Sequence, residues 1–286
     1  MVKMIIPKCL LSVMRIVTAI VTAVILLIVS VDEKDLPSPD GAEICGRYRY
    51  ALLNYDVSSQ GVTNDGTYFY FSGNKHLGKA DIKTGKMVRM NINAIPEVLQ
   101  ERGCNHIGGL SYHNGYVYAA IEDGPDYLNS FIALYDAETL EFTGTYYELP
   151  HELHLEGVPW CAVDEANNYL YTAEWSNATV LNVFDLDDLT LVKTLPLSEP
   201  VDRIQGAELY DGKLYLSCDE ENDRKRILSL DVTTGEVETA FTRNVGSQFE
   251  AEDITITVDE DGPVFHVLDR GERRMTTNLT AYRMTK

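Results

Sequence analysis

Short runs of alternating apolar and polar residues, each closed by a turn signal, fill most of the chain. In Ile204–Phe241 four such runs follow one another, with neither a helical period nor a long crossover. One of their turns is Asp211-Gly212, a pair that suits a tight hairpin because glycine tolerates a positive φ. The stretch therefore predicts one four-stranded antiparallel sheet, with strands over Ile204–Tyr210, Lys213–Cys218, Arg226–Asp231 and Glu236–Phe241.

The same pattern recurs at intervals of roughly 40–50 residues, which is the period of β-propeller blades. A turn residue is followed three positions later by an aromatic residue at Gly66/Phe69, Gly115/Tyr118, Asn168/Tyr171, Gly212/Tyr215 and Gly262/Phe265. Turns led by Asp81, Asp136, Asp185 and Asp231 recur downstream. We therefore predict an all-β fold, a β-propeller of five four-stranded blades, with a six-bladed ring as the alternative.

The last repeat lacks a fourth strand of its own, because the chain ends soon after Leu279–Met284. A spare strand lies before the first repeat, over residues 47–55 (Arg47–Tyr55). We expect this strand to pair in the last blade, since that pairing closes the ring and removes an exposed edge.

The N-terminus differs in kind from the repeats. Lys3, Lys8 and Arg15 precede the uncharged apolar run Ile16–Val31, so residues 1–31 are predicted to be a signal peptide or an N-terminal membrane anchor. Both interpretations place the positive flank inside and export the domain, which is then secreted or anchored to the outer face of a membrane. Residues 32–43 are expected to form a short linker, and residues 44–286 the propeller.

Charge and cysteine content narrow the classes of partner and site. The net charge of −20 disfavours nucleic acid and anionic membrane surfaces as partners, so we expect membrane contact through residues 1–31 only. Four cysteines follow the N-terminal segment, and they allow one or two disulfides or buried thiols: Cys45, Cys104, Cys161 and Cys218. Their spacing matches no zinc site.

The repeat also indicates where a binding site would form. In a propeller the innermost strand of each blade starts at the face on which the loop between the second and third strands opens. Polar side chains at these two repeated positions should gather at the mouth of the central channel. Gln60, Asn74, Lys75 and Glu156 occupy such positions, and the candidate ligand-binding residues are His106, Glu122, Asp123, Trp160, Glu174, Trp175, Gln205, Asp219, Glu220, Glu252, Asp253, Asp269 and Arg270.

Several kinds of chemistry fit this set. Asp219, Glu252 and Asp253 are candidate metal ligands, because carboxylate oxygens suit Ca²⁺; no other cofactor is indicated. Crowded acids also raise one another's pKa values, which suits acid–base chemistry, and the alternative is a set of solvated loops. Trp160 and Trp175 would hold sugars or cations, or pack between blades. His106 is a base or ligand, or it plugs the channel through hydrogen bonds.

The first repeat resembles a known family. Gln60-Gly61-Val62, Asp65-Gly66, Phe71-Ser72-Gly73-Asn74 and residues 81–86 are similar to the opening blade of plant- and bacterial-type glutaminyl cyclases. That resemblance implies a secreted five-bladed propeller and a cyclotransferase activity. No catalytic residue carries over, because the family's Gly-Glu-Gly and tryptophan-bearing segments are missing at the expected places. In architecture the chain also resembles lactonase- and phytase-like propellers, which place calcium at the channel mouth.

Two functions follow from these observations. The absence of GxSxG, P-loop and HExxH motifs disfavours serine hydrolases, nucleotide enzymes and zinc peptidases. The first hypothesis is a non-catalytic binding or scaffold propeller whose channel mouth takes a small molecule, a glycan or a protein. The alternative is a calcium-assisted hydrolase or lactonase, or a glutaminyl-cyclase-like cyclotransferase, that uses the carboxylates at the channel mouth. Whether the protein is an enzyme stays open at this point.

Overall fold

The computed structural model describes Met14 and residues 16–18, 38–220, 224–246, 249–271 and 276–285. The chain divides into two units, Met1–Leu36 and Pro37–Lys286. Most of the predicted signal or anchor segment lies outside the described residues. Within the described part of the chain, no helix combines the length and the apolar character needed to cross a bilayer.

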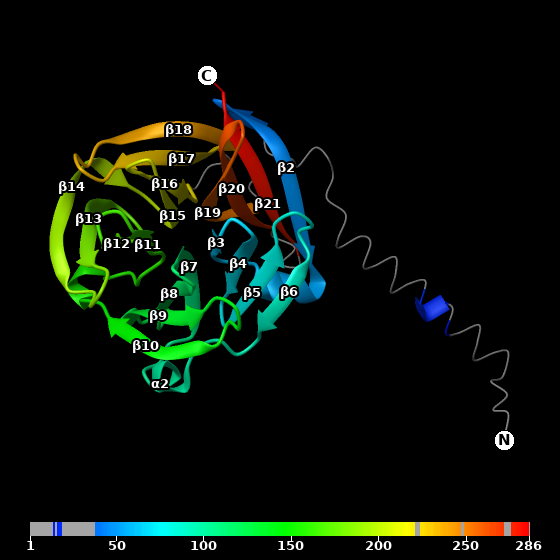
Figure 1. The fold of residues 1–286 in the computed structure, drawn as a ribbon, viewed down its shortest axis with the longest axis horizontal. Helices are drawn as coiled ribbons and strands as arrows, with labels where there is room; N and C mark the ends of the chain where they lie inside the picture. Colours follow the sequence, from blue (N-terminus) through cyan, green and yellow to red (C-terminus); the bar gives the residue numbers. More distant parts are fainter. Residues whose placement is uncertain are drawn as a thin grey trace. The chain divides into compact units, whose positions relative to one another are not determined.

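Residues 38–285 form a five-bladed β-propeller, with antiparallel sheets arranged around a centre (Figure 1). The first two blades lie in chain order from the inside to the outside. Blade 1 contains β3 (Val62–Asn64), β4 (Tyr68–Gly73), β5 (His76–Asp81) and β6 (Met87–Asn91). Blade 2 contains β7 (His106–His113), β8 (Tyr116–Glu122), β9 (Ser130–Asp136) and β10 (Phe142–Glu148).

Blades 3 and 4 repeat this order, and blade 5 does so except that its outermost strand comes from the N-terminal part of the domain. Blade 3 contains β11 (Ala162–Asp164), β12 (Tyr169–Thr172), β13 (Ala178–Asp185) and β14 (Leu191–Val201). Blade 4 contains β15 (Ile204–Tyr210), β16 (Lys213–Cys218), β17 (Arg224–Asp231) and β18 (Val237–Asn244). Blade 5 contains β19 (Phe249–Asp259), β20 (Gly262–Gly271), β21 (Thr276–Met284) and β2 (Ala42–Ala51). The five-bladed prediction is confirmed, and the six-bladed alternative is wrong.

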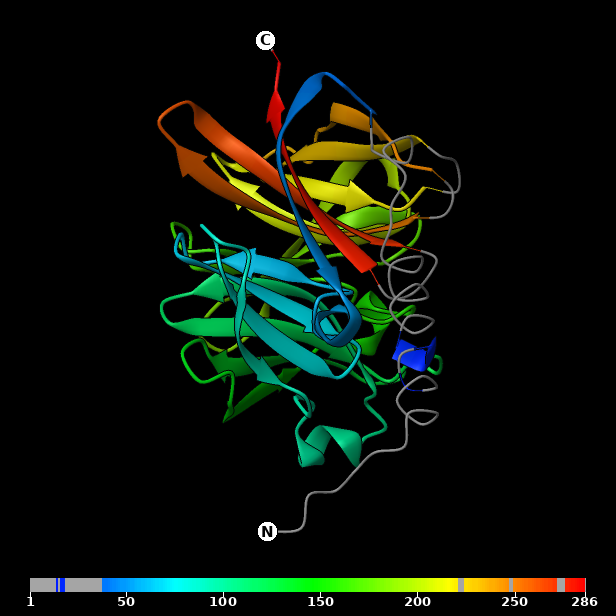
Figure 2. The same cartoon turned by 90° about the vertical axis from the view of Figure 1, so that its right-hand side faces the viewer.

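The N-terminal strand closes the ring as expected, with shifted bounds. β2 pairs antiparallel with β21, with Tyr48 opposite Leu279, and Figure 2 shows the two strands running side by side along one edge of the propeller. The strand covers residues 42–51 instead of 47–55. Residues 52–57 form the 3₁₀ helix η2 (Leu52–Val57) because the chain must turn there from the outer edge of blade 5 to the inner strand of blade 1.

Part of the predicted linker also belongs to the sheet. β1 (Ser38–Asp40) pairs with β18 and adds a fifth strand to the outer edge of blade 4, with Pro39 opposite Arg243. This pairing covers backbone groups that an edge strand would otherwise expose. Two short helices lie in connections, α2 (Glu97–Gln100) between blades 1 and 2 and the 3₁₀ helix η3 (His151–Leu153) between blades 2 and 3.

Apolar packing between adjacent blades forms the core. Each of the five junctions between blades contains its own hydrophobic cluster. At the closing junction, Tyr50 of β2 packs with Phe71 of blade 1 and Leu268 of blade 5. The aromatic residues of the repeat are all buried in such clusters: Phe69, Tyr118, Tyr171, Tyr215 and Phe265. Burial of these rings explains why an aromatic side chain recurs at that position in every blade.

The turns of the repeat are held by their leading aspartates. Asp81 Oδ1 accepts hydrogen bonds from the Thr84 N–H and hydroxyl at 2.8 and 2.7 Å. Asp136 Oδ1 accepts the same two bonds from Thr139, both at 2.8 Å. In these two turns an aspartate and a threonine three residues apart hold the turn before the outer strand. The turn of blade 3 differs, because Asp185 accepts the Asp187 N–H and Thr190 bonds Asp188.

The four cysteines of the domain are free. Cys104, Cys161 and Cys218 are buried and Cys45 is exposed. Burial raises the pKa of Cys104 to about 12, which keeps this thiol protonated and unreactive. The sequence allowed disulfides or buried thiols, and in the structure Cys104, Cys161 and Cys218 are buried free thiols.

At the centre of the ring, the inner strands converge on the carboxylate of Asp253. Its Oδ2 accepts hydrogen bonds from the N–H groups of Val62 in β3 at 2.9 Å and Leu110 in β7 at 3.2 Å. Its Oδ1 accepts the N–H of Ile254 at 2.8 Å, and the N–H of Ala207 in β15 contributes as well. One side chain thus joins the inner strands of four blades.

Glycine makes this convergence sterically feasible. β7, β15 and β19 each carry a β-bulge near the centre, and bulges redirect side chains locally. A Cβ at Gly206 in the bulge of β15 would lie 1.7 Å from Asp253 Oδ1. No other residue type fits there while Asp253 keeps its position.

We expect Gly206→Ala to destabilise the propeller strongly. The added methyl group displaces the Asp253 carboxylate from its N–H donors, so the loss should reach or exceed the roughly 1–3 kcal/mol typical of overpacking. Gly46→Ala is the matched control, because a Cβ at Gly46 would make only an ordinary 3.6 Å contact with Ala281. Urea unfolding measures both variants. Equal stabilities of the two would contradict the steric argument.

Candidate functional site

A pocket of about 250 Å³ lies where the inner ends of the blades meet. All five blades or their connections contribute to its wall. The lining residues are Gln60, Asn74, His106, Gly108, Gly109, Glu122, Tyr127, Glu156, Pro159, Trp175, Gln205, Glu250, Glu252 and Arg270. Six of the thirteen candidate ligand-binding residues from the sequence are therefore brought together: His106, Glu122, Trp175, Gln205, Glu252 and Arg270.

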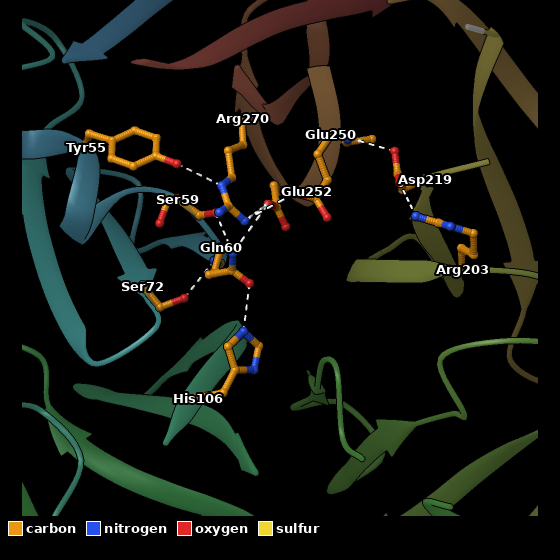
Figure 3. Close-up of polar contacts among 12 residues, drawn as sticks. Tyr55, Ser59, Gln60, Ser72, His106, Arg203, Asp219, Glu250, Glu252 and Arg270 are labelled. Carbon is orange, nitrogen blue, oxygen red and sulfur yellow. Dashed lines mark hydrogen bonds and ion pairs between the residues drawn. The ribbon is translucent and has the colours of Figure 1, made fainter. Parts of the chain in front are cut away.

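Gln60 connects the two polar sides of the pocket (Figure 3). His106 Nε2 donates to Gln60 Oε1 at 2.8 Å. The Gln60 amide donates to the Ser59 carbonyl at 2.9 Å and to Glu252 Oε1 at 3.4 Å. Because both acceptors face the amide nitrogen, the amide orientation is fixed, and the Gln60 oxygen faces His106.

His106 joins blades 1 and 2 through both of its ring nitrogens. Nε2 reaches Gln60, and Nδ1 lies 3.1 Å from Glu122 Oε1 on the neighbouring strand β8. Neither nitrogen can accept a proton from a ligand without breaking one of these contacts. The histidine therefore orients Glu122 and Gln60 in this structure.

Glu252 and Arg270 form the opposite side of the pocket. Arg270 Nη1 lies 3.2 Å from Glu250 Oε2 and 3.7 Å from Glu252 Oε1, and its Nε donates to Tyr55 Oη at 2.8 Å. Burial raises the pKa of Glu252 well above 4.5, and the negative charge of Glu250 raises it further while Arg270 opposes the rise. Arg270 is thus already paired with carboxylates of the same blade.

Glu122 differs from Glu250 and Glu252, the pocket carboxylates that contact Arg270. Its side chain is 9% exposed, and one oxygen faces His106. The other oxygen, Oε2, is buried and has no hydrogen-bond partner among the described residues. A buried carboxylate oxygen without a donor is costly, so this atom marks the point where the pocket is chemically incomplete.

Three of the predicted acidic residues form ion pairs outside the pocket. Asp219 contacts Arg203 Nη2 and Lys225 Nζ, each at 2.6 Å, and accepts the Ala251 N–H at 3.0 Å. Asp269 accepts two bonds from the fully buried Arg243 Nη1 at 2.7 and 2.8 Å. The third pair joins Glu220 Oε1 and Arg226 Nε at 2.7 Å. These pairs stabilise blade 4 and its junction with blade 5.

Other predicted residues also have structural roles. Asp123 accepts hydrogen bonds from the Asn129 N–H at 2.8 Å and side-chain amide at 2.7 Å, which holds the loop after β8. Glu174 accepts the Leu155 N–H at 2.7 Å. Trp160 is fully buried in the cluster between blades 3 and 4. Trp175, in contrast, lines the pocket, with the Arg203 guanidinium 5.0 Å from its ring centroid.

The three predicted calcium ligands do not share a coordination site. Asp253 receives backbone N–H groups, Asp219 is paired with two cations, and Glu252 faces Gln60 and Arg270. Across residues 38–285, within the described ranges, no group of three or more His, Cys, Asp or Glu side chains is arranged to hold a metal ion. Asp219, Glu252 and Asp253 therefore do not form a shared calcium site in this structure.

Sequence reasoning missed several lining residues. Glu250 shares a face of β19 with Glu252, as expected for residues two apart in a strand, and this alternation was a usable signal. Tyr127 lies in the loop between β8 and β9 and reaches the pocket through a backbone with φ of 50°. No pattern in the repeat predicts such a conformation.

Comparison with known proteins places the chain in a family. A family profile described as "Repeat of unknown function (DUF6923)" matches residues 103–261, which is more than half of the chain. The chain belongs to this family. The DUF6923 match runs from just before β7 to the turn after β19, so it excludes residues 60–86, which carry the glutaminyl cyclase resemblance.

Other comparisons are more distant. No curated protein matches the sequence. A solved structure titled "Kuenenia stuttgartiensis Hydrazine Synthase" is similar at 12% identity with a TM-score of 0.45, over 81% of this chain and 64% of that chain. The chain therefore spans less than two thirds of the length of that protein.

The raised pKa of Glu252 predicts a pH-dependent stability. Its folded pKa lies above the ordinary 4.5, so the protonated form is favoured in the fold, and this contribution is lost as the pH rises from about 4.5 through the raised value. Glu252→Gln keeps the neutral state. We expect the variant to lose less stability than the wild type as the pH rises above about 4.5, because glutamine has no proton to release at this position.

The measurement is urea unfolding at several pH values. Glu148→Gln, which alters an exposed carboxylate paired with Arg102, should give a curve parallel to that of the wild type. Parallel curves for Glu252→Gln and the wild type would show that Glu252 does not change its proton affinity on folding.

Proposed function

We propose that this protein is an extracytoplasmic, membrane-anchored β-propeller that binds a small ligand in the acidic pocket at the mouth of its central channel. The observation that carries the proposal is the pocket itself. It lies where all five blades meet, and it combines four glutamates, three amides and two aromatic residues with one arginine that already has partners. Ligand pockets with a few convergent polar groups are usual at such positions.

The size and charge of the pocket limit the ligand. A volume of about 250 Å³ is below the range of roughly 300–1,000 Å³ usual for drug-sized ligands. The ligand is therefore a small molecule, or one terminal group of a glycan or a protein. Glu122 and Glu156 are not neutralised by Arg270, which favours a cationic or polyhydroxylated group over an anionic one.

Acid–base catalysis is a second candidate function. The observation that favours it is Glu252, a buried carboxyl group with a raised pKa that lines the same pocket as His106. Perturbed carboxyl groups of this kind serve as general acids. A lactone, an ester or an N-terminal glutaminyl peptide would be the substrate class.

Thermal unfolding with a panel of small amines, sugars, carboxylates, lactones and N-terminal glutaminyl peptides tests the binding function. We expect at least one class to raise the melting temperature of the wild type, because a ligand specific for the native state stabilises it by RT ln(1 + [L]/Kd). Gln205→Trp should abolish the rise by filling the pocket. Ile92→Trp, which introduces the same side chain at an exposed site, should leave the rise unchanged.

The outcomes separate the candidates. Equal shifts in the wild type and Gln205→Trp would place binding outside the pocket, and no shift with any class would contradict a small-molecule site. Turnover of a panel member that Glu252→Gln abolishes without loss of binding would favour the catalytic candidate.

Export has its own test. Residues 1–40 fused to a reporter enzyme that is active only in an oxidising compartment should give an active reporter in a bacterial host, and the reporter should sediment with membranes if the segment is retained. Residues 32–40 alone provide the control and should give no activity. Equal activity of the two fusions would contradict the export signal.

A further inference from the structure

The side of the pocket formed by Glu122 has no lysine or arginine among its described lining residues. Glu122 Oε1 faces His106 Nδ1 at 3.1 Å, and Oε2 has no partner among the described residues. It is the one buried side-chain atom in the described pocket lining that lacks a hydrogen-bond partner. The positive charge of Arg270 lies on the other side, where Glu250, Glu252 and Tyr55 already contact it.

The wall around this atom is built closely. Gly157 has a φ of 85°, and a Cβ there would lie 2.0 Å from Glu122 Oε2 and 2.8 Å from Tyr127 Cδ1. The carboxylate, the glycine backbone and the tyrosine ring therefore meet at one point in the wall of the pocket. Glu156 lies close enough that its charge, together with that of Glu122, raises the pKa of Tyr127 further above the rise that burial causes.

We propose that this subsite, formed by Glu122, Glu156 and Tyr127, binds the ammonium group of a small ligand. The inference rests on the proposed function. An ammonium group donates to the unpartnered Glu122 oxygen in a charge-assisted hydrogen bond, and the Tyr127 ring lies beside the cation. Only Oε2 of Glu122 lacks a hydrogen-bond partner among the described residues, and this buried atom meets the ligand when the side chain rotates toward the pocket. A single acceptor suits a monodentate ammonium better than a guanidinium, whose planar fork needs two acceptors.

Three small probes test the subsite on the propeller as it exists in the full chain. Ethanolamine supplies an ammonium group, ethylene glycol is its neutral counterpart of similar size, and methylguanidinium is a forked cation. Calorimetric titration at pH 7 and low salt should give the highest affinity for ethanolamine. We expect the two other probes to bind about tenfold more weakly or not at all.

Matched variants identify the residue responsible. Glu122→Gln should reduce the affinity for ethanolamine by about tenfold or more, and Tyr127→Leu should reduce it by a smaller factor. Asp126→Asn removes the same charge from an exposed side chain in the adjacent loop and should leave the affinity unchanged. Glu252→Gln removes a carboxylate from the other side of the pocket and should cost less than Glu122→Gln. Circular dichroism and melting temperature establish that each variant is folded.

Specific results overturn the inference. Unchanged affinity in folded Glu122→Gln, equal binding of ethylene glycol, or equal losses in Glu122→Gln and Glu252→Gln would each exclude an ammonium contact with Glu122. If other compounds still protect the wild type and not Gln205→Trp, the pocket binds a ligand of another class, and only the subsite inference fails. If no compound protects either protein, the proposed function fails as well.

Discussion

The inner strands of this propeller depend on one carboxylate, that of Asp253. Both of its oxygens accept backbone N–H groups, and the donors belong to the inner strands of four different blades. Burial raises the pKa of Asp253 to about 8, while the N–H donors act in the opposite direction. Every donor is a backbone N–H group, so a side chain substituted elsewhere cannot take over the role of the Asp253 carboxylate. The geometry in turn requires glycine at position 206, where any side chain would displace the carboxylate.

The pocket follows from the same local geometry. The β-bulge between Ala251 and Ile254 in β19 interrupts the strict alternation of side chains. Adjacent residues still point to opposite faces, so Glu252 lines the pocket while Asp253, its neighbour, bonds the inner strands. The five apolar clusters lie between the blades and the Asp253 contact lies at their centre. The side chains at the channel mouth are consequently not needed for the core, and the fold can present them to a ligand.

Local chemistry explains why the sequence predicted the blades and only part of the site. A turn, an aromatic residue three positions later and an Asp-led turn are all set within a few residues, so the repeat revealed the strands, their order and the closing role of the N-terminal strand. Partners distant in sequence decide the role of each carboxylate. Asp219 and Asp269 occupy the repeated positions at strand ends, yet Arg203, Lys225 and Arg243 pair with them. The repeat contains no information on those partners.

Glu122 and Asp123 illustrate the same limit at adjacent positions. Asp123 accepts two hydrogen bonds from Asn129 and fixes its own loop, whereas one buried oxygen of Glu122 has no donor among the described residues. An unmet acceptor of this kind costs the free protein about 1–3 kcal/mol. The fold carries this cost at the mouth of the channel, beside a glycine whose Cα leaves room for that oxygen alone. Buried polar groups without hydrogen-bond partners are expected at functional sites. A hydrogen-bond donor on a bound ligand would recover the lost free energy as binding energy.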